Sequence, residues 1–151
     1  MQMLIPIIAF LGIIVGTLLK KYIPEENKPG IKYRNVAERL ILIALGSYLL
    51  AVTFTSTLSS YLFILLGIVL GTFLLQPYLY LGLALSTLDF TVASLTFIFG
   101  ISHGKKNSIL PALLFFAPFL LLLTSINTNF LLLTASGAFL AIAIKKNYNL
   151  L

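Results

Sequence analysis

Asp89 is the side chain with the clearest chemical potential in this sequence. It lies near the middle of an apolar stretch from about residue 78 to residue 100, and it is the one acidic residue far from a polar segment. An ionisable group at the centre of a membrane-spanning helix costs about 2.5–3.5 kcal/mol to insert, so it faces protein or water rather than lipid. We therefore expect Asp89 either to bind a proton or another cation, or to join two helices as a neutral, hydrogen-bonded carboxyl.

Small and hydroxyl-bearing residues recur around Asp89 at alternating intervals of four and three, which places them on one face of a helix. We expect the hydroxyls of Ser86 and Thr96 to complete the proton- or cation-binding site. Small residues allow a second helix to approach closely. We expect this packing role for Gly82, Ala93 and Gly100, and for the pairs Gly12 with Gly16 and Gly67 with Gly71.

His103 is the one histidine of the chain and ends the same stretch beside Gly104 and Lys105. At 1.5 Å of rise per residue it lies about 21 Å from Asp89, too far for direct contact within one helix. We expect it at the membrane interface. The sequence has no cysteine, no HExxH, no phosphate-binding glycine loop and no nucleophile elbow. We therefore expect no catalytic residues, no metal, no cofactor and no enzymatic activity.

The elements that position these residues are apolar blocks. The chain has 151 residues, of which 60% are hydrophobic and 9% charged, and its mean hydropathy is +1.07. A soluble domain normally carries about 25% charged residues, so lipid must cover part of this surface. The blocks are long enough for helices that cross a hydrocarbon core of about 30 Å. They cover about residues 3–19, 39–54, 58–75, 78–100, 109–124 and 130–144.

This pattern predicts an all-α, polytopic transmembrane bundle of about six helices in a single domain, 1–151. The break at Gln76-Pro77 divides it into similar halves, 1–76 and 77–151, each with three blocks and a basic loop. Three helices per half would produce an inverted repeat, as in many secondary transporters. Two alternatives stay open. The likeness of the halves could follow from composition alone, or five crossings with a broken or re-entrant segment within 58–100 would place all ten basic residues on one side.

The charges bracket the apolar blocks. Lysines and arginines follow the first block and fill the segment up to Arg39, and two lysine pairs, at 105–106 and 145–146, follow later blocks. Such bracketing is typical of membrane topology signals, which favours a cytoplasmic location for loop 20–38 in a multi-pass protein of the cell membrane. It differs from the continuous basic stripe of a nucleic-acid-binding protein, so no nucleic-acid partner is expected.

These features favour a small membrane protein of transporter or channel type, coupled to protons or cations through Asp89. The alternative function is a non-catalytic transmembrane subunit of a larger membrane complex, since the chain has short loops and no sizeable soluble part. The lipid bilayer is the expected environment. Further partners would be a second copy of the chain, because 151 residues leave little room for an enclosed pathway, or other membrane subunits.

Overall fold

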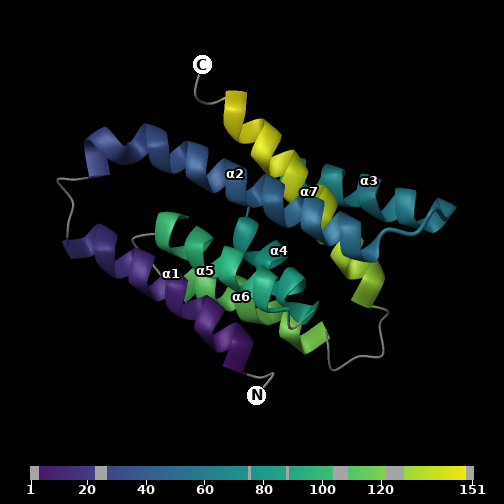
Figure 1. Ribbon diagram of the computed structural model, residues 1–151, viewed down its shortest axis with the longest axis horizontal. Coiled ribbons are helices and arrows are strands. Elements are labelled where there is room, and N and C mark those ends of the chain that lie inside the picture. The colour runs from purple at the N-terminus through teal and green to yellow at the C-terminus, as the bar shows by residue number, and fades with distance from the viewer. Residues whose placement is uncertain are drawn as a thin grey trace.

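The computed structural model describes residues 4–22, 27–74, 76–87, 89–103, 109–121 and 128–148 (Figure 1). These ranges contain helices and short connections but no strand, which confirms the all-α class. The helices are α1 (Leu4–Tyr22), α2 (Asn27–Thr53), α3 (Leu58–Phe73), α4 (Pro77–Ala84), the 3₁₀ turn η1 (Leu85–Thr87), α5 (Phe90–His103), α6 (Ile109–Leu121) and α7 (Thr128–Tyr148).

Three of these helices are long and apolar enough to cross a membrane. The suitable segments are Ile5–Tyr22 in α1, Tyr33–Thr53 in α2 and Thr128–Lys145 in α7. An 18-residue helix is about 27 Å long, close to the hydrocarbon thickness of a bilayer. The helices α3 and α5 are apolar but shorter. This composition and length agree with a membrane protein.

The helix α2 begins twelve residues before the apolar block that predicted it, so much of the segment expected to be a loop is helical. Pro29 and Gly30, which suggested a turn, lie in or next to the first turn of α2. Proline is tolerated there because the first backbone N–H groups of a helix have no partner within the helix. The early start brings Arg34 and Glu38 into the body of α2.

The predicted block 78–100 is two helices rather than one, so the six-helix count is not confirmed. The helix α4 ends at Ala84 and passes through η1, and α5 begins at Phe90. The hydroxyl of Thr87 donates to the carbonyl of Ala84 at 3.0 Å and accepts the backbone N–H of Asp89 at 3.3 Å. Short polar side chains of this kind compete with the helical hydrogen bonds and favour a helix end.

Glycines bring α1 and α5 into backbone contact. A Cβ atom at Gly12 would lie 2.3 Å from the carbonyl oxygen of Phe97, and one at Gly16 would lie 2.2 Å from that of Gly100. Residue numbers rise together along the contact, so α1 and α5 run in the same direction.

The helices α3 and α7 form a second parallel pair. A Cβ atom at Gly67 would lie 2.1 Å from the carbonyl oxygen of Thr134, and one at Gly71 would lie 2.7 Å from that of Ala138. The first pair joins α1, from the first block of one predicted half, to α5, from the first block of the other. The second pair joins α3 and α7, the last helices of the two halves. Helices in corresponding places therefore run in the same direction, and the inverted repeat is not confirmed. The additional helix α4 is the reason, because it adds one reversal of chain direction between the halves.

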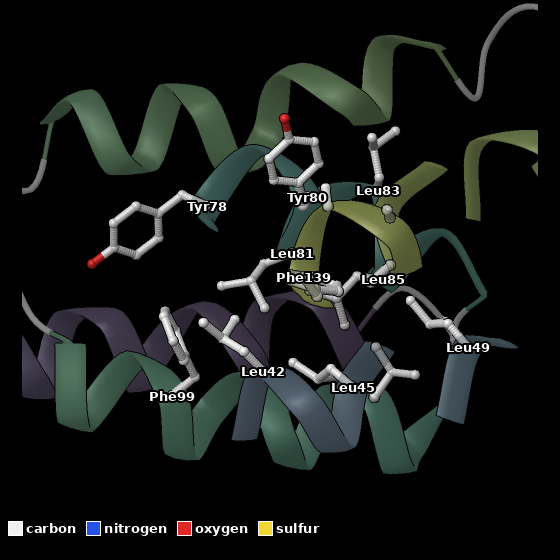
Figure 2. Packing of buried hydrophobic residues seen from close by; sticks show 14 of the residues in the cluster. Leu42, Leu45, Leu49, Tyr78, Tyr80, Leu81, Leu83, Leu85, Phe99 and Phe139 are labelled. Atoms are coloured by element: carbon white, nitrogen blue, oxygen red, sulfur yellow. The ribbon is translucent and has the colours of Figure 1, made fainter. Parts of the chain in front are cut away.

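Large apolar side chains fill the space between α2, α4, α5 and α7 (Figure 2). Leu42, Leu45 and Leu49 project from one face of α2 toward Leu81 and Leu85, as Figure 2 shows. Tyr78, Tyr80, Phe99 and Phe139 complete the same cluster, and each is at most 1% exposed. In contrast, α1 and α3 expose many leucine, isoleucine and valine side chains on their outer faces. Exposed apolar surface of this extent is typical of a membrane or protein contact.

Basic side chains lie at one end of this bundle. Lys20 approaches the main-chain oxygen of His103 at the end of α5, and Tyr78 at the start of α4 donates to the same oxygen, both at 3.5 Å. Lys145 donates to the carbonyl of Thr72 near the end of α3 at 2.8 Å. Asp89 lies at the other end of α5.

Candidate functional site

Asp89 directly precedes α5 and caps its first turn. Its Oδ1 accepts the backbone N–H of Thr91 at 2.8 Å, and its carbonyl accepts the N–H of Ala93 at 3.0 Å as the first helical bond. Aspartate is a preferred residue at a helix N-terminus because its carboxylate satisfies an otherwise unpaired N–H group. The negative charge is also favourable at the positive end of the helix dipole.

A second helix reaches the same carboxylate. The hydroxyl of Tyr48, on α2, donates to Oδ2 of Asp89. Asp89 lies between helices, outside the three segments that could cross a membrane. The hydroxyl of Tyr48 and, next, the N–H of Thr91 hold the pKa of Asp89 below its usual value, because both donate to the ionised carboxylate. The arrangement therefore favours a negatively charged Asp89, not the neutral carboxyl that a position at the membrane centre would favour.

Asp89 lies toward one end of the bundle. Tyr48 is five residues before the end of α2, which corresponds to about 8 Å of helix. Ile5 and Ile8, at the start of α1, line the same shallow groove as Phe90, the residue after Asp89. Asp89 therefore lies near one end of the bundle, whereas the sequence predicted a central position. The prediction treated residues 78–100 as one helix, and the chain reverses at Asp89 instead.

The other residues of the predicted site are distributed over different surroundings. The hydroxyl of Ser86 is buried in η1 without a hydrogen-bond partner. Thr96 is completely buried, but its hydroxyl donates to the carbonyl of Val92 in its own helix at 2.7 Å. Neither hydroxyl bonds Asp89, whose carboxylate partners within the described ranges are Tyr48 and Thr91.

The small residues of the predicted face also point to different neighbours. A Cβ atom at Gly82, in α4, would lie 2.1 Å from the carbonyl oxygen of Phe115 in α6. One at Gly100, in α5, would lie 2.5 Å from the backbone nitrogen of Ile13 in α1. Ala93 is buried on α5. The break before Asp89 divides the single predicted face into two, each with its own packing partner.

A second ionisable contact, not predicted from the sequence, joins the body of α2 to the last residue of α5. Oε2 of Glu38 lies 2.7 Å from Nδ1 of His103. A signal for it exists in the sequence, because Glu38 precedes Leu42, Leu45 and Leu49 at helical intervals and so belongs to the buried face of α2. The prediction of a loop up to residue 38 concealed this periodicity.

Comparisons with protein-family models, curated proteins and solved structures found no match to this chain.

Proposed function

We propose that the chain is a small multi-pass membrane protein of transporter or channel type, in which the charge of Asp89 attracts a cation. The observation that carries this proposal is the position of Asp89 where η1 and α5 meet and where Tyr48 attaches α2. Acidic side chains near the entrance of a membrane pathway attract cations, as the Asp and Glu rings of cation channels do. A carboxylate with two donors and a partly exposed side chain can still accept a cation on its remaining lone pairs.

The proposed topology has seven crossings in alternating directions, formed by α1, α2, α3, α4 with η1, α5, α6 and α7. Two of these crossings are short: α4 with η1 is about 18 Å long and α5 about 21 Å. The helix α5 nevertheless extends beside α1 from Ile8 to Lys20. A bilayer adapts to short helices by thinning locally. This topology brings Lys20, Arg34 and Lys145 to one side, which the positive-inside rule identifies as cytoplasmic. Asp89 would then be near the opposite surface.

The substitutions Asp89→Asn and Asp89→Ala separate the charge of Asp89 from its capping role. Asparagine removes the charge but caps a helix about as well as aspartate, whereas alanine removes both. We expect Asp89→Asn to remain folded and to lower cation flux into proteoliposomes by about tenfold or more. Flux would be measured with potassium, sodium and proton gradients in turn, using Ser94→Ala as the matched control. Ser94 is also on the first turns of α5, but its hydroxyl bonds only the carbonyl of Phe90.

Wild-type flux in folded Asp89→Asn would contradict the role of its charge. An absence of flux in the wild-type protein would contradict the transport proposal itself. Gentle solubilisation and co-purification from the native membrane would then show whether the chain travels with other subunits in fixed proportion, as a non-catalytic subunit should, or as a homo-oligomer.

A further inference from the structure

Glu38 is a carboxylate enclosed between α2 and α5, at the far end of the helix pair from Asp89. The residue is 2% exposed. Its Oε2 lies 2.7 Å from Nδ1 of His103, and its Oε1 lies 3.6 Å from Nε of Arg34, one turn earlier on α2. A buried carboxylate is costly unless charged or hydrogen-bonding groups compensate it. Here each carboxylate oxygen has such a neighbour.

Among the described residues, four helices contribute polar or aromatic groups around His103. From α1, the amine of Lys20 lies 3.5 Å from the main-chain oxygen of His103. From α4, the hydroxyl of Tyr78 lies 3.5 Å from that oxygen, and its ring centre is 5.6 Å from the imidazole. From α5 itself, the ring of Phe99 stacks on the imidazole at 5.1 Å and 23°. From α2, Glu38 contacts the imidazole and Arg34 contacts Glu38. The bond to Glu38 and the two ring contacts orient the imidazole.

The neighbours of Glu38 favour one position for the imidazole hydrogen. The guanidinium of Arg34 beside Oε1 favours the ionised form of Glu38. An ionised carboxylate can only accept hydrogen bonds, so Nδ1 of His103 must carry a hydrogen and donate it. In the neutral imidazole the second nitrogen, Nε2, then has no hydrogen and presents its lone pair.

We infer that His103 is a proton-binding site, with Nε2 as the atom that accepts the proton and Glu38 as the counter-ion. The proton adds to the lone pair of Nε2, no other bond breaks, and the ring becomes positively charged. The side chain of His103 is 22% exposed and that of Glu38 is 3% exposed, so the imidazole is the more accessible of the two groups. The charged ring strengthens the hydrogen bond to Glu38 and hence the contact of α2 with α5. This site is independent of the transport proposal for Asp89.

The chain has one histidine, so ¹⁵N-labelled histidine produces NMR signals from this ring alone. The full chain would be placed in lipid nanodiscs and observed at neutral and at acid pH. We expect the neutral wild-type ring to hold its hydrogen on Nδ1 and to gain a second hydrogen on Nε2 in acid. In Glu38→Gln, where the amide can either donate or accept, we expect the share of neutral ring with hydrogen on Nδ1 to fall about twofold or more.

The matched control is Asp89→Asn, which removes the same charge from the other end of the α2–α5 contact, about 21 Å away along α5. Its spectra should equal those of the wild-type protein. A neutral wild-type ring with hydrogen on Nε2, or a ring that gains no hydrogen in acid, would overturn the inference. An unchanged ring in folded Glu38→Gln would overturn the role of Glu38. If that variant does not fold, the wild-type titration decides alone. No flux is measured, so the result is separate from the test of transport.

Discussion

Tyr48 donates a hydrogen bond to Asp89 and thereby attaches the C-terminal part of α2 to the start of α5. The same two helices meet again where Glu38 contacts His103. Between these contacts the interface is apolar and closely packed, with Leu42 and Leu45 at most 1% exposed. Each polar contact therefore joins α2 to α5 at its own end of this apolar interface.

The capping role of Asp89 predicts a graded loss of stability. Asp89→Ala removes the acceptor for Thr91 and for Tyr48, and should lower the free energy of unfolding by about 0.5–2 kcal/mol. Asp89→Asn should lose less, since asparagine still accepts the backbone N–H. Reversible unfolding in mixed micelles, followed by circular dichroism, would measure both. Equal losses in the two variants would show that the cap contributes little.

The ionised form of Asp89 also predicts a pH dependence. The Tyr48 hydroxyl and the Thr91 N–H hold the pKa of Asp89 below its usual 3.8. The stabilisation is thus fully present above the unfolded-state pKa and decreases as the pH falls through the lower folded-state pKa. With Asp89→Asn as a reference that does not titrate, the difference in unfolding free energy should be constant near neutral pH and shrink in acid. A difference that grows in acid would mean that the folded protein raises this pKa.

The contact of α1 with α5 predicts that small residues are required at its crossing point. Gly16→Ala places a methyl group 2.2 Å from the carbonyl oxygen of Gly100, so the two backbones must separate. Overpacking of this kind typically costs about 1–3 kcal/mol. The control is Gly30→Ala near the start of α2, where a Cβ atom meets nothing within 4 Å. Thermal unfolding should show a loss for Gly16→Ala only, and equal behaviour would argue against a close α1–α5 contact in the membrane.

The proposed topology predicts which positions share a side of the membrane. The chain has no cysteine, so single cysteines can be introduced without background labelling. With seven crossings, Lys21→Cys and Lys145→Cys should react with a membrane-impermeant thiol reagent from the same side, and Ser56→Cys from the opposite side. Six crossings would instead place residues 21 and 145 on opposite sides. Labelling of intact and opened vesicles distinguishes the two.

Several features of this protein follow from the sequence alone. The apolar blocks and the scarcity of charge determine the helical class and agree with a membrane environment, because an unpaired backbone is too costly in lipid. The glycines at 12, 16, 67, 71, 82 and 100 could also be identified as positions of close helix approach, since spacing on one helix is a local property. Asp89 could be singled out because a charge within an apolar stretch is conspicuous.

Which helices pack together, and which residues contact Asp89, could be seen only in the tertiary structure. The break before α5 reflects competition between helical hydrogen bonds and the side chains of Thr87 and Asp89, which hydropathy does not measure. That one break changes the direction of every later helix, and so it makes α1 parallel to α5. The contacts of Asp89 with Tyr48 and of His103 with Glu38 join residues 41 and 65 positions apart. No local pattern specifies such pairs, because they exist only once the apolar faces of α2 and α5 have packed together.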